Sequence, residues 1–371
     1  HSFFETCAGH LGMKIVFTGG GTAGHVTPNL ALIESFQRDG IECFYIGSRA
    51  GIEAKLVERH NLDFYGIASG KLRRYFDWQN FIDPVKILFG FFQALWILLW
   101  RRPEVLFSKG GFVAVPVVIA AWSLRIPVVI HESDLTPGLA NRLSAPFCRM
   151  ICLNFEETAA HFAQRATRVT GTPLRAGLVQ SDGERGRQWL NGFKAVGEIQ
   201  PILLVVGGSL GAQSINRLVR ADLAQLTERF HVVHVVGGGG IDPEFVETLH
   251  YQQFEYLDEP YGDVVAASDV VISRAGANAL FEFLWFKKPQ LLIPLPSAAS
   301  RGDQLQNAAL FEQKGYAEVR HEGDLGPGEL ARAVDSVWMV RFDMARRLGS
   351  VSLPDSLGLI RQAIEAAAAA N

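Results

Sequence analysis

The sequence contains few cysteines and no excess of positive charge. Four cysteines occur in 371 residues, and Cys148 and Cys152 do not have C-x-x-C spacing. A disulfide framework is therefore excluded, and we expect free thiols in a reducing compartment. The 35 basic residues are outnumbered by 38 acidic ones. This balance argues against a nucleic-acid-binding surface, which usually needs a basic footprint.

Patterns that metal-dependent or dinucleotide-dependent chemistry needs are also missing. No D-x-D motif and no His/Cys cluster with zinc spacing occurs, so we expect no cofactor and no dedicated metal site. Magnesium would help only by meeting phosphate charge. Gly19, Gly21 and Gly24 do fit G-x-G-x-x-G, but the second predicted strand ends in Gly47 and Ser48. A dinucleotide site would carry an acidic residue there, so that interpretation is disfavoured.

The start of the chain shows no signal peptide. Residues 1–12 lack a charged start and an apolar stretch, and a strand pattern follows Met13 at once. We interpret residues 1–12 as an added leader outside the fold. The remaining composition, 48% hydrophobic and 20% charged, is typical of a globular chain, and the length favours two domains.

Short apolar, β-branched runs alternate with segments of helical length, which is typical of βαβ units and a parallel sheet. The predicted strands are 14–18, 42–46, 105–108, 128–130 and 150–153 in the first half, and 202–206, 232–236, 254–257, 270–273 and 290–293 in the second. Residues 171–186 are rich in Gly, Pro and charge and are predicted to form a linker.

The two halves repeat one pattern. "IVFTGGGTAGH" and "LLVVGGSLGAQ" are each an apolar strand, a glycine turn and the start of a helix. We therefore predict an α/β chain of two Rossmann-like parallel-sheet domains that face each other across a cleft. The expected boundaries are 13–175, 176–353 and a closing helix in 354–371. Each glycine turn would aim backbone N–H groups at a phosphate.

Seven ordered segments resemble one family of enzymes. "GGTAGHVTP", "SKGGFVAVPVVIAA", "HESDLTPGLAN", "GTPLR", "GGSLGAQSIN", "SRAGANALFE" and "GDQLQNA" are similar to segments of the MurG family, the UDP-N-acetylglucosamine–N-acetylmuramyl-(pentapeptide) pyrophosphoryl-undecaprenol N-acetylglucosamine transferases. The resemblance implies a GT-B fold and inverting transfer of GlcNAc from UDP-GlcNAc to the C4 hydroxyl of MurNAc in lipid I, which makes lipid II.

That reaction belongs to peptidoglycan synthesis, and hence to cell shape and division, at the cytoplasmic face of the bacterial inner membrane. Three alternatives remain: a related transferase with another lipid acceptor such as diacylglycerol, a UDP-GlcNAc epimerase of the same architecture, and a nucleotide-sugar-binding protein without catalysis.

The resemblance also implies binding residues. Those for the acceptor are Gly21, Thr22, Ala23, Gly24, Gly110, Gly111, Phe112, Asp134 and Asn141. Those for UDP-GlcNAc are Thr22, Ala23, Gly24, His25, Asn141, Arg175, Ser209, Leu210, Gly211, Asn216, Tyr256, Leu257, Ala277, Asn278, Glu282, Gln304 and Asn307. Four positions depart from the residues common in the family: Ala23, Phe112, Asp134 and Leu210.

Inverting transfer needs a base for the acceptor hydroxyl and support for the departing UDP. His25 is the first candidate for the base because imidazole titrates near neutrality, and Glu132 is the second. Alternatively, His25 binds the acceptor diphosphate and Glu132 orients other groups. Arg175 and the helix start at 209–212 would receive the leaving diphosphate. Glu282 would accept hydrogen bonds from the ribose hydroxyls.

Residues 84–103 form the most apolar stretch, too short and too interrupted to span a membrane. Because the stretch is apolar all round, a helix here must bury more than one face. Basic and aromatic neighbours favour peripheral docking on an anionic membrane, and the alternative is a helix buried inside the domain. The residues predicted to contact the membrane are Arg73, Arg74, Trp78, Phe91, Trp96 and Trp100.

Overall fold

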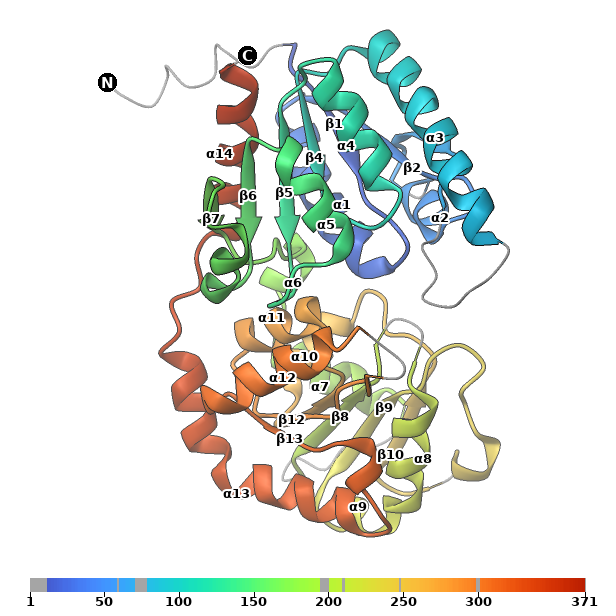
Figure 1. Ribbon diagram of the computed structural model, residues 1–371. Coiled ribbons are helices and arrows are strands. Elements are labelled where there is room, and N and C mark those ends of the chain that lie inside the picture. Colours follow the sequence, from blue (N-terminus) through green and yellow to red (C-terminus); the bar gives the residue numbers. More distant parts are fainter. Residues whose placement is uncertain are drawn as a thin grey trace. The chain divides into compact units, whose positions relative to one another are not determined.

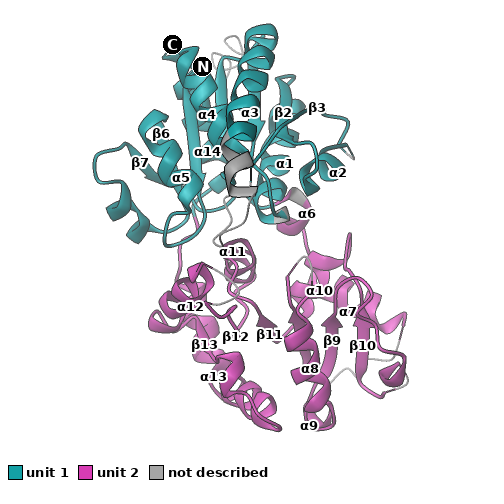
Figure 2. Ribbon diagram, turned by 45° about the vertical axis from the view of Figure 1, so that its right-hand side comes forward, with its two compact units in different colours: residues 1–174, 354–371 teal, residues 175–353 magenta. Residues whose placement is uncertain are grey.

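The computed structural model describes residues 12–58, 60–70, 79–193, 200–208, 211–246, 248–297 and 301–370, without the side chains of 23, 79–84 and 176. The chain divides into two compact units (Figure 2): unit 1 is His1–Leu174 with Pro354–Asn371, and unit 2 is Arg175–Leu353. The predicted leader therefore lies almost wholly outside the described residues.

The described residues of unit 1 form a seven-stranded parallel sheet in the order β3-β2-β1-β4-β5-β6-β7 (Figure 1). The strands are β1 (Lys14–Thr18), β2 (Glu42–Ser48), β3 (Asp63–Ile67), β4 (Val105–Ser108), β5 (Val128–Glu132), β6 (Met150–Leu153) and β7 (Thr167–Val169). The reversal of strand order at β1 and β4 puts the loops after these two strands at the switch point, where such sheets bind ligands.

Helices cover both faces of this sheet. They are α1 (Ala23–Arg38), α2 (Ile52–Glu58), α3 (Gln79–Arg101), α4 (Ala114–Ser123), α5 (Leu139–Ser144) and α14 (Ser356–Ala369), with short 3₁₀ turns η1 (Ala145–Phe147) and η2 (Glu156–Phe162). Ile15 and Phe17 pack in the cluster with α1 and α14, and Val16 packs in the cluster with α3 and α4. This alternation explains why the strands read as unbroken apolar runs.

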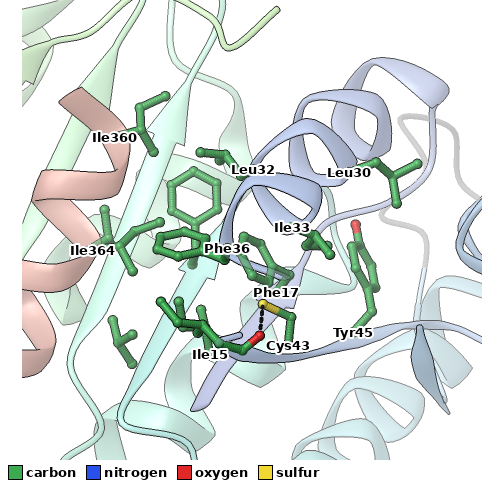
Figure 3. Packing of buried hydrophobic residues seen from close by; sticks show 14 of the residues in the cluster. Ile15, Phe17, Leu30, Leu32, Ile33, Phe36, Cys43, Tyr45, Ile360 and Ile364 are labelled. Atoms are coloured by element: carbon green, nitrogen blue, oxygen red, sulfur yellow. Dashed lines mark hydrogen bonds between the residues drawn. The ribbon is translucent and has the colours of Figure 1, made fainter. Parts of the chain in front are cut away.

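The C-terminal helix α14 completes unit 1 rather than unit 2. Figure 3 shows Ile360 and Ile364 pointing from α14 toward Leu32 and Phe36 of α1. Arg361 adds a hydrogen bond of 2.7 Å to the Ser35 hydroxyl. The last turns of the chain therefore fill part of the core under the first helix.

The described residues of unit 2 form a six-stranded parallel sheet in the order β10-β9-β8-β11-β12-β13. Its strands are β8 (Ile202–Val206), β9 (His231–Val235), β10 (Tyr251–Phe254), β11 (Val270–Ser273), β12 (Gln290–Leu292) and β13 (Ala317–Val319). Its helices are α6 (Ala176–Val179), α7 (Gly183–Asn191), α8 (Gln213–Ala221), α9 (Leu223–Arg229), α10 (Tyr261–Ala267), α11 (Ala277–Trp285), α12 (Asp303–Gln313) and α13 (Glu329–Gly349), with 3₁₀ turns η3 (Pro243–Phe245) and η4 (Glu322–Asp324). The predicted pair of Rossmann-like parallel sheets is thus confirmed.

Some local predictions were wrong. The strand predicted at 254–257 is β10, which ends at Phe254, so Tyr256 and Leu257 follow the strand. The predicted linker 171–186 contains α6 and the start of α7, which begins under an Asp182 cap. The sheet-edge strands β3, β7 and β13 were missed because they are short and only partly buried, so they carry no strong apolar pattern.

The packing of α14 predicts that Ile364→Ala destabilises unit 1. The side chain is fully buried, so its removal leaves a cavity and should lower the free energy of unfolding by about 2 to 5 kcal/mol. Urea unfolding of unit 1 measures this. The matched control is Gln362→Ala on the exposed side of the same helix, which should change stability by less than about 0.5 kcal/mol. Equal effects of the two variants would contradict the packing.

Candidate functional site

Two glycine loops meet at the switch point of unit 1. The Gly20 N–H donates to the carbonyl of Gly110 at 3.3 Å. Gly111 has φ +85°, and a Cβ there would collide with the backbone of Gly20. Only glycine allows this approach. The loops after β1 and β4, predicted from separate motifs, therefore form one continuous surface.

His25 lies in the first turn of α1, directly beside these loops. Its Nδ1 is 3.1 Å from the carbonyl oxygen of Lys109. A carbonyl only accepts hydrogen bonds, so Nδ1 carries a proton and the lone pair of the neutral ring lies on Nε2. The Thr22 side chain does not cap this helix. The backbone thus holds the imidazole in the tautomer that a general base needs.

Glu132 ends β5 and is 4% exposed. Its carboxylate accepts hydrogen bonds from the backbone N–H groups of Asp134 and Gly138, both at 3.0 Å, and from Asn141 Nδ2 at 2.9 Å. Asn141 Nδ2 also donates to the carbonyl of His131 at 3.0 Å. These contacts make Glu132 and Asn141 organisers of the 133–138 loop, which favours the orienting role over that of base.

A second buried carboxylate lies under the first glycine loop. Glu53 of α2 is fully buried and accepts from the Ser48 N–H at 2.8 Å and from the Gly21 N–H at 3.5 Å. Sequence analysis missed it because a glutamate near a helix start is ordinary. Of the other predicted acceptor residues, Gly21 and Thr22 are exposed and Phe112 and Asp134 are half-buried. The side chain of Ala23 is not described.

In unit 2 a matching glycine turn leads into α8. Gly211 has φ +74°, and a Cβ there would lie 2.5 Å from the carbonyl oxygen of Val236. The N-cap residue Ala212 makes no side-chain cap hydrogen bond, and the N–H groups at such a helix start can bind an anion. The predicted donor residues Ser209 and Leu210 lie outside the described residues.

Glu282 of α11 is half-buried and meets a tyrosine that sequence analysis missed. The hydroxyl of Tyr261 donates to Glu282 Oε2 at 2.9 Å. The pKa of Glu282 is raised because burial has the largest effect. The hydrogen bond from Tyr261 and the charge of Arg175 oppose this shift only in part. Arg175 is exposed. The structure therefore brings the charges of two predicted donor residues, Glu282 and Arg175, close to each other, and Tyr261 at the start of α10 bonds to Glu282.

Other predicted donor residues hold loops. Asn216 is 4% exposed; its Nδ2 donates to the carbonyl of Val236 at 2.9 Å, and its Oδ1 is 2.9 Å from His234 Nε2. Gln304 accepts from the Leu295 N–H at 3.1 Å. Asn307 is fully buried and donates to the carbonyl of Ala275 at 3.2 Å. These amides shape the loops around α8 and α11.

The remaining donor predictions lie at the ends of β10 and β11. Tyr256 is exposed, and Leu257 is half-buried against the unit 2 core. Ala277 is buried and Asn278 half-buried at the start of α11. Just before them, Arg274 is 7% exposed and donates to the carbonyl of Ile293 at 2.9 Å. Arg274 was missed although it lies inside the "SRAGAN" segment.

Helix α3 has one buried and one exposed apolar face. Ala94 and Leu98 pack in the core. The outward residues, each more than half exposed, are Val85, Leu88, Phe89, Phe92, Trp96, Leu99 and Trp100. We call this set the α3 face. Of the predicted membrane residues, Trp96 and Trp100 belong to it.

Phe91 is half-buried and packs against the core, so it does not belong to the α3 face. Its neighbour Phe92 is more than half exposed. Arg101, at the end of the same stretch, is held by Asp63 at 2.7 Å and Glu42 at 2.6 Å, so its charge is already paired. Arg73, Arg74 and Trp78 lie outside the described residues.

The described residues contain no group of three or more His, Cys, Asp or Glu side chains that could hold a metal ion. Within the same part of the chain, no helix has both the length and the apolar character needed to cross a bilayer.

Solved structures share this fold. The crystal structure of MurG from Acinetobacter baumannii has a TM-score of 0.74 at 24% identity and covers 95% of this chain and 99% of that one. UDP-GlcNAc 2-epimerase from Neisseria meningitidis, bound to UDP-GlcNAc, has a TM-score of 0.65 at 12% identity and covers 94% and 98%. At these identities the likeness shows the fold alone.

Sequence comparisons identify the family. A curated transferase of Clostridium botulinum (strain Langeland) is 48% identical over 325 residues, 88% of this chain and 91% of that protein; one from strain Alaska E43 is 45% identical over 351 residues, 95% and 97%. Both are named UDP-N-acetylglucosamine–N-acetylmuramyl-(pentapeptide) pyrophosphoryl-undecaprenol N-acetylglucosamine transferase. The N-terminal domain of glycosyltransferase family 28 matches residues 15–152, and its C-terminal domain matches residues 202–346. The chain therefore belongs to glycosyltransferase family 28.

Proposed function

We propose that this enzyme transfers N-acetylglucosamine from UDP-GlcNAc to the C4 hydroxyl of N-acetylmuramic acid in a pyrophosphoryl-undecaprenol acceptor, lipid I. The observation that carries the proposal is the 48% identity, over 88% of the chain, to transferases named for this reaction. The contacts of His25 in unit 1 and of Glu282 in unit 2 support it. The resulting lipid II would serve peptidoglycan synthesis.

On the acceptor side, His25 acts as the general base. The acceptor hydroxyl oxygen attacks the anomeric carbon from the face opposite UDP, the bond from that carbon to the diphosphate oxygen breaks, and the hydroxyl proton passes to His25 Nε2. The tautomer fixed by the Lys109 carbonyl leaves that nitrogen able to accept the proton. Glu132, whose carboxylate already accepts three N–H groups, shapes the loop that meets the acceptor.

On the donor side, unit 2 binds the nucleotide. The N-terminus of α8, whose N-cap residue Ala212 makes no side-chain cap hydrogen bond, and the guanidinium of Arg175 stabilise the negative charge that builds on the leaving diphosphate. The carboxylate of Glu282, held by Tyr261, accepts from the ribose hydroxyls. Backbone groups near Leu257 read the uracil, because the Leu257 side chain packs inward.

The α3 face supports docking of the enzyme on the membrane that carries the proposed acceptor. A helix that exposes Phe92, Trp96 and Trp100 together offers aromatic side chains suited to the interfacial layer of a bilayer. The opposite face of α3 is packed in the core, so the helix would lie along the surface. The proposed location is the cytoplasmic face of the inner membrane.

The assay that tests the function measures UDP release from UDP-GlcNAc with and without a lipid I analogue in detergent. Release should depend on the analogue and yield a disaccharide product. His25→Ala should reduce turnover by about 10² to 10⁴-fold, the usual contribution of a positioned base, while calorimetry still detects UDP-GlcNAc binding.

Different failures have different meanings. No analogue-dependent release by the unaltered enzyme would exclude lipid I as acceptor, and release only with diacylglycerol would identify the related lipid transferase. Interconversion of UDP-GlcNAc without any acceptor would identify an epimerase. Full activity of His25→Ala would exclude His25 as the base. His60→Ala, a partly exposed histidine paired with Glu34, is the matched control and should stay active.

Glu282→Ala should weaken UDP-GlcNAc binding by about tenfold to a hundredfold, because hydrogen bonds to a charged group contribute about 1.5 to 3 kcal/mol. Tyr261→Phe should weaken binding less and in the same direction, since it removes the hydroxyl that orients the carboxylate. Isothermal titration calorimetry measures both. Glu259→Ala, an exposed glutamate nearby, is the control. Unchanged affinity in Glu282→Ala would remove Glu282 from the donor site.

Phe92→Ser and Trp96→Ser should each lower the affinity for vesicles that contain anionic lipid. Burying an aromatic side chain in an apolar layer contributes about 1.5 to 3 kcal/mol, so about a tenfold loss or more is expected in co-sedimentation. Phe342→Ser, which alters an equally exposed phenylalanine of unit 2, should have no effect. Retained binding in both α3 variants would show that this face does not contact lipid.

A further inference from the structure

A fully buried lysine lies between the two glycine loops and the end of β5. Lys109, the residue before Gly110, is 1% exposed. Its Nζ is 2.5 Å from His131 Nδ1 and donates to the hydroxyl of Ser133. An isolated ammonium is expensive to bury, so a lysine that is kept here needs partners. Nothing in the proposed mechanism yet uses this side chain.

The partner histidine is arranged to accept from the lysine. His131 is fully buried, and its Nε2 lies 2.9 Å from the carbonyl oxygen of Gly171. Nε2 therefore carries the ring proton and Nδ1 offers its lone pair to Lys109. Burial and the charge of Lys109 hold the pKa of His131 well below its usual value. The neutral imidazole thus serves as a fixed acceptor.

The same lysine contacts both groups that face the acceptor. Its backbone carbonyl accepts from His25 Nδ1 at 3.1 Å, and its N–H donates to the carbonyl of Thr18 at 3.0 Å. Its side chain holds Ser133, the first residue of the loop that Glu132 organises through Asp134 and Gly138. One residue therefore connects the end of β1, the candidate base and the loop after β5.

We propose that Lys109 is a positioning residue for the transfer reaction, which fixes His25 through its carbonyl and the 133–138 loop through its ammonium group. This inference rests on the proposed function, because the proposed function assigns the 133–138 loop to acceptor binding. Loss of the ammonium should impair use of the acceptor while leaving the donor site of unit 2 intact. If Lys109 only stabilised the fold, its loss would impair the use of the donor and of the acceptor alike.

The charge of Lys109 is poised to change near neutral pH. Burial lowers the pKa of Lys109 to about 7, although the carboxylates of Glu132 and Asp134 and the thiol of Cys152 oppose the shift. The other titratable groups that face it are His131 and, at its carbonyl, His25. Below this pKa the ammonium balances Glu132 and Asp134, and above it the amine keeps two N–H donors but loses the charge. Acceptor-dependent activity should therefore fall as the pH rises through about 7.

The test compares the unaltered enzyme with Lys109→Met over pH 6 to 9, in the UDP-release assay with the lipid I analogue. Lys109→Met should raise the KM for the analogue or lower kcat by about tenfold to a hundredfold, the effect of losing a charge-assisted hydrogen bond. It should also abolish the alkaline fall in rate. The Kd for UDP-GlcNAc should stay within about twofold.

Two further variants make the test decisive. Asp134→Asn removes a charge that favours the ammonium form of Lys109, so the alkaline fall in rate (the alkaline limb of the pH–rate profile) should move to lower pH. This variant tests the inference even if Lys109→Met does not fold. Lys288→Met removes a half-buried lysine of unit 2, whose Nζ donates to the carbonyls of Ala266 and Ser268 at 2.7 Å. This variant should leave the alkaline fall in rate unchanged.

An alkaline limb that is the same in the unaltered enzyme, Lys109→Met and Asp134→Asn would overturn the inference. So would equal losses of donor and acceptor binding in Lys109→Met. Absence of any transfer by the unaltered enzyme would instead refute the proposed acceptor, which keeps the two failures distinct.

Discussion

The close backbone contact between Gly20 and the Gly110–Gly111 pair is the constraint on which the proposed acceptor side of unit 1 depends. It exists because β1 and β4 are neighbours in the sheet and because no side chain stands between the loops that leave them. The contact brings the Lys109 carbonyl to His25. Any Cβ at Gly111 would push the loops apart and separate His25, the proposed base, from the Lys109 carbonyl.

Unit 2 has a similar close approach beside its proposed donor site. There Gly211 approaches the end of β9 at Val236, and Asn216 donates from α8 to the carbonyl of Val236. The N-cap residue of α8, Ala212, makes no side-chain cap hydrogen bond, which would suit a diphosphate. In both units glycine provides the close approach, and a buried amide or carboxylate then fixes the loop. The two halves therefore share a construction and differ in the polar groups placed beside it.

Several buried polar residues in the family motifs stabilise the backbone through hydrogen bonds. Glu132, Asn141, Asn216 and Asn307 are each at most 5% exposed, and each bonds to backbone groups of a loop or, for Asn141, of the end of β5. His25 and Arg175 are more accessible. The motifs therefore contain residues that are proposed to bind ligands and residues that hold a loop in place. The residues that hold a loop are buried and bond to backbone groups. Lys109 is one of these residues, and its charge connects it to the residues proposed to bind the acceptor.

The sequence by itself determined the two parallel sheets, both glycine turns and the family, because buried strands, Gly spacing and ordered motifs are local signals. It also placed His25 and Glu282, which lie within those motifs. Only the tertiary structure decided the rest. Tyr261 meets Glu282 from another helix, Lys109 meets His131 from another strand, and α14 packs on α1 from the far end of the chain. Phe91 and Phe92 are neighbours of identical chemistry, and which one faces the core depends on how α3 is rotated against its sheet. These outcomes depend on contacts between segments distant in sequence, which no local pattern encodes.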